Sequence, residues 1–210
     1  MKNQFLLIAS CIFFAFTSSN AQVGISVASG LNVSNCKFTN YEAFSTTARR
    51  DYFLSLAPSY QFNEKFRLLV DFQYSRKGFA IGNNNNQTNS ESRYSYLDVI
   101  PQIEYKLHRF FAIGLGVNYA LVVNEDIKDE KGNWVNTKKI ETIKQSDFGI
   151  IGKIKGEYKN IFCFVSYNLG LKNITNLQYV DENNKTTAVS QFNRNLQVGL
   201  GYTFNFKKNK

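Results

Sequence analysis

Residues 195–206, with the sequence NLQVGLGYTFNF, alternate between large apolar side chains and small or polar ones. The even-numbered positions carry Leu, Val, Leu, Tyr, Phe and Phe, whereas positions 197 to 205 between them carry Gln, Gly, Gly, Thr and Asn. Successive side chains of a β-strand point to opposite faces of a sheet, so this pattern predicts a strand with one apolar face. The aromatic side chains favour the same interpretation, because they pack well on a pleated surface.

The same alternation occurs in seven other segments of the chain. They cover residues 23–33, 52–62, 66–75, 97–106, 111–121, 148–158 and 161–172. Each segment is roughly ten residues long or longer, which is typical of strands that cross a membrane at a tilt. Together with residues 195–206, these segments predict an all-β protein of eight strands. A chain of 210 residues suits one domain of this kind.

The composition excludes several other classes of protein. Hydrophobic residues make up 43% of the chain, including 19 Phe and 12 Tyr, which excludes an intrinsically disordered protein. The longest apolar run, Phe5–Phe16, is too short to cross a bilayer as a helix, so a protein of several transmembrane helices is also excluded. The net charge of +9 is dispersed without a basic stripe, and we therefore expect no nucleic-acid partner.

Residues 1–21 have the layout of a secretory signal peptide. Lys2 precedes the apolar run, and the small residues Ser19-Asn20-Ala21 end it, so we expect cleavage after Ala21 and export of residues 22–210. Two alternatives are a buried N-terminal helix and a lipid anchor at Cys11, which follows Ile8-Ala9-Ser10. Export places the remaining cysteines, Cys36 and Cys163, in an oxidising compartment.

The connections between the predicted strands alternate in length. Residues 63–65, 107–109 and 159–160 form tight turns, whereas four long polar segments cover residues 34–50, 77–93, 124–146 and 173–190. In a soluble β-sandwich, nothing requires the short connections to lie at one end and the long ones at the other. A transmembrane barrel, in contrast, has short periplasmic turns and long extracellular loops. We therefore predict an all-β, eight-stranded, antiparallel up-and-down transmembrane β-barrel over residues 22–206, followed by a basic tail at Lys207–Lys210.

The polar faces of the predicted strands bring charged side chains into the lumen. In lipid, the outward face of such a barrel is apolar, and eight strands enclose only enough space for side chains to fill. Four acids and three bases fall on the inward face, and we expect them to form a mixed-sign structural network: Arg67, Asp71, Asp98, Glu104, Lys153, Lys155 and Glu157. The alternatives are a pore lining and, for Lys153 and Lys155, a site for an anionic ligand.

Few residues of the sequence are candidates for catalysis or metal binding. His108, the single histidine, lies in a predicted periplasmic turn, and we expect no catalytic residue, no metal site and no cofactor. Cys36 and Cys163 fall near opposite ends of their strands, roughly 20–25 Å apart, which predicts two free thiols. Trp134 lies in the third long connection, and it is the candidate for an exposed contact residue.

Several short motifs resemble the PorT-like outer-membrane β-barrel family of Bacteroidota. They are Tyr96–Pro101 with Tyr105, then Phe111–Gly114 with Gly116, the segment Tyr167–Ile174, and the terminal Asn195–Phe204. The resemblance covers essentially all of residues 22–206 and implies an eight-stranded outer-membrane barrel without catalytic residues. The Lys207–Lys210 tail departs from the family, in which the chain often ends on the aromatic residue.

These observations predict a non-enzymatic, monomeric outer-membrane barrel that presents four long loops for structural or interaction roles. Its expected partners are outer-membrane lipid, the barrel-assembly machinery during insertion, and a protein at the extracellular loops. The alternatives are an accessory component of a secretion or surface-assembly machine, as the family name suggests, a narrow channel, and a periplasmic lipocalin-like ligand binder.

The barrel prediction can be tested on a gel. We expect the detergent-folded protein to migrate differently before and after boiling, because a closed barrel resists detergent until it is heated, and we expect it in the membrane fraction. Migration unaffected by boiling, together with protein in the soluble fraction, would contradict a barrel and favour the lipocalin-like alternative.

Overall fold

The computed structural model describes residues 22–39, 45–82, 88–129, 131–138, 143–180 and 186–206. The predicted signal peptide (1–21) and basic tail (207–210) lie outside these described residues. Eight long strands occur in the described ranges: β1 (Gln22–Thr39), β2 (Ser45–Gln61), β3 (Phe66–Gly82), β4 (Thr88–His108), β5 (Phe111–Lys128), β7 (Ser146–Tyr158), β8 (Ile161–Gly170) and β11 (Ser190–Phe206). Three short strands accompany them: β6 (Trp134–Asn136), β9 (Gln178–Val180) and β10 (Thr186–Ala188).

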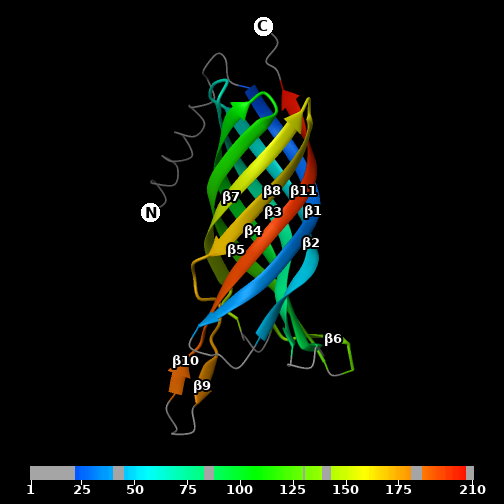
Figure 1. The fold of residues 1–210 in the computed structure, drawn as a ribbon, viewed down its shortest axis with the longest axis vertical. Helices are drawn as coiled ribbons and strands as arrows, with labels where there is room; N and C mark the ends of the chain where they lie inside the picture. The colour runs from blue at the N-terminus through cyan, green and yellow to red at the C-terminus, as the bar shows by residue number, and fades with distance from the viewer. Residues whose placement is uncertain are drawn as a thin grey trace, which may run out of the picture.

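The eight long strands close into a barrel (Figure 1). Their order is β4-β3-β2-β1-β11-β8-β7-β5, and a further pairing of β4 with β5 completes the ring. All of these pairings are antiparallel, and Val23 of β1 lies opposite Phe206 of β11, so the first and last described residues lie at the same end. The predicted all-β, eight-stranded antiparallel barrel is confirmed.

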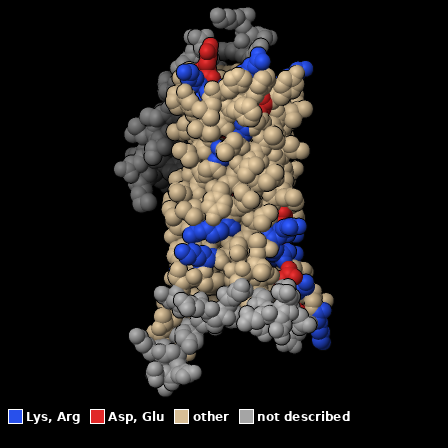
Figure 2. Space-filling view, viewed as in Figure 1, with Lys and Arg blue, Asp and Glu red and all other residues tan. Residues whose placement is uncertain are grey.

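The side chains are distributed in the opposite way from those of a soluble protein. Alternate residues of each long strand are exposed apolar groups, such as Leu115 (71% exposed), Leu200 (66%) and Ile154 (65%). The residues between them point inward and include many buried polar side chains, among them Asn32, Gln102 and Ser75. Figure 2 shows the result as a wide zone of the barrel wall that is almost free of acidic and basic side chains. An outer face of this kind suits hydrocarbon, and the buried face suits a polar lumen.

The tight turns lie close to their predicted positions, although β4 continues to His108, so its turn to β5 is residues 109–110 rather than 107–109. Asn63 stabilises the β2–β3 turn, because its Oδ1 atom accepts hydrogen bonds from the backbone N–H groups of Lys65 and Phe66, both at 2.8 Å. Lys159, in the β7–β8 turn, has a φ of 56°, the left-handed conformation that a two-residue hairpin loop requires. The short turns and the C-terminal end of β11 therefore share one end of the barrel, the short-turn end, opposite the long-loop end.

The predicted long loops are shorter than expected. Residues 34–39, 45–50, 77–82 and 88–93 continue strands β1 to β4, so the prediction of a solvated loop is wrong for these stretches. Similarly, β5 continues to Lys128 and pairs with β6, and β9 pairs with β10 in a separate hairpin. Backbone hydrogen bonds between strands do not depend on apolar side chains, so a polar sequence can extend the sheet beyond the apolar zone. The remaining parts, residues 40–44, 83–87, 130, 139–142 and 181–185, lie outside the described residues.

Candidate functional site

The seven charged residues assigned to the lumen come from three strands and all lie inside the barrel. Arg67 and Asp71 belong to β3, Asp98 and Glu104 to β4, and Lys153, Lys155 and Glu157 to β7. None of these side chains is more than 14% exposed. Their strands lie close together in the ring, since β3 pairs with β4 and only β5 separates β4 from β7. The alternation of each strand therefore directs the charges toward one side of the lumen.

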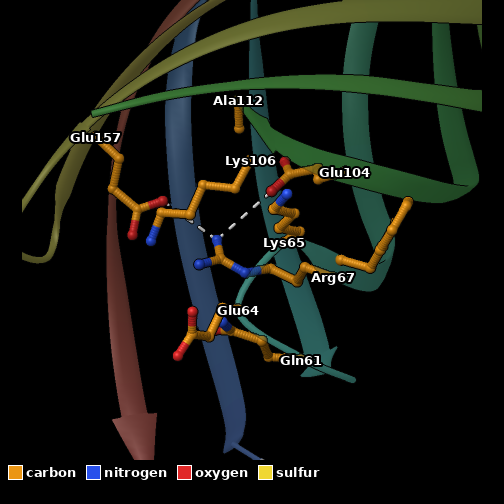
Figure 3. A pocket seen from close by; sticks show the side chains of 9 residues that line it. Gln61, Glu64, Lys65, Arg67, Glu104, Lys106, Ala112 and Glu157 are labelled. Carbon is orange, nitrogen blue, oxygen red and sulfur yellow. Dashed lines mark hydrogen bonds and ion pairs between the residues drawn. The ribbon is translucent and has the colours of Figure 1, made fainter. Parts of the chain in front are cut away.

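Four of the seven residues form a closed set of ion pairs near the short-turn end. Arg67 donates from one guanidinium nitrogen to Glu104 at 3.5 Å and to Glu157 at 3.2 Å. The Nζ atom of Lys155 lies 2.5 Å from Glu104 and 3.4 Å from Glu157. Figure 3 shows Arg67 between the two carboxylates, in a pocket that the turn residues Glu64 and Lys65 also line. Each acid thus faces both bases, and the set balances two negative against two positive charges.

Lys153 and Asp71 form a second ion pair, which lies farther from the short-turn end and has a longer N–O distance. Their Nζ and Oδ2 atoms are 3.8 Å apart, and their side chains are 9% and 6% exposed. The Lys153 ammonium also lies 4.9 Å from the ring centroid of Phe164, and that of Lys155 lies 5.3 Å from the centroid of Phe162. Aromatic faces attract cations, so both lysines are held between carboxylates and rings. This arrangement leaves their ammonium groups engaged within the lumen, which does not favour the anionic-ligand alternative.

The seventh residue, Asp98, is paired with Lys77, which lies in a segment that the sequence predicts to be a loop. Lys77 donates to Asp98 Oδ1 at 2.6 Å, and Ser75 donates to Asp98 Oδ2 at 2.6 Å. The two ionised side chains are 1% and 0% exposed, and the Lys77 ammonium lies 4.5 Å from the ring centroid of Tyr96. Lys77 continues the inward alternation of β3 beyond Gln73 and Ser75. Extending that alternation into the polar segment would have identified it.

Further buried acids lie in the half of the lumen nearer the long loops. Asp147 of β7 accepts a hydrogen bond from Asn193 Nδ2 at 2.8 Å, and Glu125 of β5 is 2% exposed. Neither is predicted from the sequence, because Glu125 lies in a segment expected to be a loop and Asp147 lies at the boundary of that segment. Taking an ionised group out of water is costly unless partners satisfy it, so these residues depend on the surrounding polar side chains.

Apolar side chains also lie in the lumen between the charged groups. Ala28, Phe53, Phe162 and Phe164 form one buried cluster. A second cluster contains Cys36, Phe79, Tyr94, Tyr96, Ala120 and Ile143. The rings of Phe53 and Phe164 approach to 5.7 Å, from β2 and β8, which are not neighbours in the ring. Side chains from distant strands therefore meet inside the barrel.

Trp134, the predicted contact residue, begins β6 and is only partly exposed. The guanidinium carbons of Arg93 and Arg49 lie 4.2 Å and 4.6 Å from its ring centroid, and the ammonium of Lys128 lies 6.0 Å away. Carboxylates hold these cations in turn: Asp126 pairs with Arg93 at 2.8 Å, and Glu91 pairs with Arg49 at 2.6 Å and with Lys128 at 2.9 Å. The ring is thus fixed at the long-loop end by a charged cluster that sequence spacing did not reveal.

The cysteines and acids offer no metal site within the described ranges. Cys36 faces the lumen and is 3% exposed, and Cys163 is exposed on the outer face, so the prediction of two free thiols is confirmed. Among the described residues, no three His, Cys, Asp or Glu side chains are arranged to hold a metal ion. No described helix is long and apolar enough to cross a membrane.

Comparison with known proteins agrees with this architecture. The model of a family described as outer membrane protein beta-barrel domain matches residues 16–176. The solved structure of the outer membrane protein OprG from Pseudomonas aeruginosa is 14% identical, covers 86% of this chain and 95% of OprG, and has a TM-score of 0.50. The solved structure of Ail, the attachment invasion locus protein of Yersinia pestis, is also 14% identical. It covers 89% of this chain and 100% of Ail, and it has a TM-score of 0.46. No curated protein matches the chain.

The stability of the barrel should depend on the buried ion pair of Lys77 and Asp98. We expect Lys77→Met to lower the free energy of unfolding by about 3–5 kcal/mol, because it leaves the Asp98 carboxylate buried without its cation. The double variant Lys77→Met/Asp98→Asn removes both charges and should recover much of the loss. Denaturant titration of the detergent-folded protein, read by gel mobility, measures both.

Lys65, exposed in the β2–β3 turn, provides the matched control. Lys65→Met also removes one positive charge, but we expect a change of no more than about 0.5 kcal/mol, as is usual for surface positions. Equal losses for the variants at positions 65 and 77 would show that the buried pair has no structural role.

Proposed function

The chain belongs to the outer membrane protein beta-barrel domain family, and from this premise we propose that it is a non-enzymatic barrel with a closed lumen. In this proposal the lumen side chains hold the wall together and conduct no ions. The long-loop end makes the contacts outside the cell. We also propose that residues 1–21 are the cleaved signal peptide, and that the chain belongs with the PorT-like proteins of Bacteroidota.

The observation that carries the proposal is the mutual pairing of the lumen charges. A conducting pore needs charged groups that face water and exchange ions with it. Here Arg67 and Lys155 each contact both Glu104 and Glu157, and Lys77 contacts Asp98. An eight-stranded barrel has an interior that side chains can fill completely, unlike the wide porins. The lumen residues therefore favour a structural role over a pore lining.

The position of His108 supports the absence of an enzyme activity. It is the single histidine of the chain, and it is exposed at the last position of β4, at the short-turn end. A general base must lie within hydrogen-bond reach of the proton that it abstracts. Histidine is therefore not available as a base at the long-loop end, where the substrate of an outer-face enzyme would bind.

Trp134 and its charged neighbours support a contact role for the long-loop end. Trp and Arg are the residue types most enriched among strong contributors to protein interfaces. The cluster holds a Trp ring and two Arg side chains in fixed positions, so they lose little conformational entropy on binding. We propose that a protein partner contacts this cluster. The other proposed partners are outer-membrane lipid, in which the monomer is embedded, and the assembly machinery during insertion.

Conductance tests the closed lumen. We expect no stepwise ionic conductance when the folded full-length protein is inserted into a planar bilayer, because the ion pairs and packed rings of the lumen oppose the passage of hydrated ions. A large water-filled porin inserted in the same way is the positive control. Stable conductance steps from protein whose insertion is confirmed would replace the proposed function by a narrow channel.

Fluorescence tests the environment of Trp134, because it is the single tryptophan of the chain. In the folded protein we expect neutral acrylamide to quench its emission less strongly than in the unfolded protein, because the charged cluster covers part of the ring. Arg93→Gln should raise the quenching, whereas Lys65→Gln, at the other end, should leave it unchanged. Equal quenching of the folded and the unfolded wild type would contradict a ring held in this cluster.

A further inference from the structure

Three arginines face outward where the apolar zone of the barrel ends. Arg50 lies on β2, Arg76 on β3 and Arg194 on β11, all toward the long-loop end of their strands. The next outward residue toward the membrane zone is a large apolar or aromatic one in each case: Tyr52, Tyr74 and Leu196. Figure 2 shows Lys and Arg side chains gathered at this level of the visible face. We name Arg50, Arg76 and Arg194 the outer basic belt.

The sheet register brings the belt together on one side of the barrel. Strand β1 lies between β2 and β11, with Val33 opposite Arg50 and Asn35 opposite Arg194. Neighbouring strands are about 4.8 Å apart, so these two arginines are separated by roughly 10 Å across the sheet and by two positions along it. The guanidinium of Arg76, on the other side of β2, lies 4.8 Å from the ring centroid of Tyr52. The three side chains thus form one patch over β3, β2, β1 and β11.

The belt differs from Arg49, Arg67 and Arg93 in having no acidic partner among the described residues. Arg49, Arg67 and Arg93 each form a salt bridge, whereas Arg50, Arg76 and Arg194 form none with a described carboxylate. Strands β3, β2, β1, β11 and β8 contain two acids, Asp51 and Asp71. Both face inward and pair with Arg49 and Lys153. The outer surface of these five strands therefore carries positive charge that the described strands do not neutralise.

Local contacts hold two of the belt side chains while leaving donors free. Arg194 donates from one nitrogen to the backbone carbonyls of Gly170 (2.7 Å) and Asn193 (2.9 Å). Arg76 Nε is 3.4 Å from the hydroxyl of Tyr74. A guanidinium has five N–H donors in a fork that matches phosphate oxygens, so each of these arginines retains donors for a ligand. Side chains already held in place lose less entropy when they bind.

We propose that the outer basic belt binds the phosphate groups of anionic lipids in the leaflet on the long-loop side. Lipid phosphates lie immediately beyond the hydrocarbon zone, which is the level at which the outward apolar residues give way to these arginines. Basic side chains close to a membrane surface are attracted by anionic headgroups. The proposal rests on the embedding of the barrel in the outer membrane, and it is independent of whether the lumen conducts or the loops bind a partner.

Native mass spectrometry of the folded full-length protein in detergent tests the proposal. Phosphatidic acid is the probe for a lipid phosphate, and phosphatidylcholine, whose choline group neutralises the phosphate, is the reference lipid. We expect tighter binding of phosphatidic acid to the wild type. Each of Arg50→Gln, Arg76→Gln and Arg194→Gln should weaken it about five-fold, and the triple variant should lose the preference. Heat-dependent gel migration confirms that each variant is folded.

The matched control is the triple variant Lys65→Gln/Arg109→Gln/Lys159→Gln. It removes three exposed positive charges at the short-turn end, so its net charge equals that of the belt variant. We expect it to retain the preference for phosphatidic acid. Equal losses in both triple variants, or no preference in the wild type, would overturn the proposal. Displacement of the lipid by an equal concentration of inorganic phosphate would overturn the assignment to a lipid headgroup, whereas retention supports it.

Discussion

Closure of the backbone hydrogen bonds is the constraint on which this structure depends. In hydrocarbon no water satisfies an unpaired N–H or C=O group, so a sheet survives there only without edges. The pairing of β4 with β5 removes the last two edges of the ring of long strands. Because the sheet closes, each of these strands has one face toward lipid and one toward the lumen, and the period of two in the sequence follows from that.

The same closure sorts the charged side chains into two environments. Inward charges such as Lys77 and Asp98 are cut off from bulk water, so each must find a partner inside the barrel. Outward charges are excluded from the hydrocarbon zone and begin where it ends, at Arg50, Arg76 and Arg194. Closure of the barrel thus has two results: the charges of the lumen form ion pairs, and the outward arginines have no acidic partner among the described residues. The first supports a closed barrel, and the second supports recognition of anionic lipid.

The strands of the membrane zone could be predicted from local alternation, but their ends could not. From Leu196 to Phe206 every outward residue is apolar, so the alternation that predicts the strand is strong. Beyond Ser34 the outward residues Asn35, Lys37 and Thr39 are polar, and beyond Lys77 the large apolar residues Phe79 and Ile81 fall on the inward face, although the backbone pairing continues to Thr39 and Gly82. For this reason the sequence predicts loops at Lys77 and Glu125, and it does not reveal the partner of Asp98.

The sequence by itself determined the number of long strands, their inward and outward faces and the free thiols, because these follow from a local period of two and from strand length. Only the tertiary structure decided which charges meet. Arg67 and Glu157 are far apart in the sequence but 3.2 Å apart in the lumen, and Trp134 stacks against Arg49 and Arg93 from two other strands. Such contacts depend on the order and register of the closed sheet, which alternation within one strand does not encode.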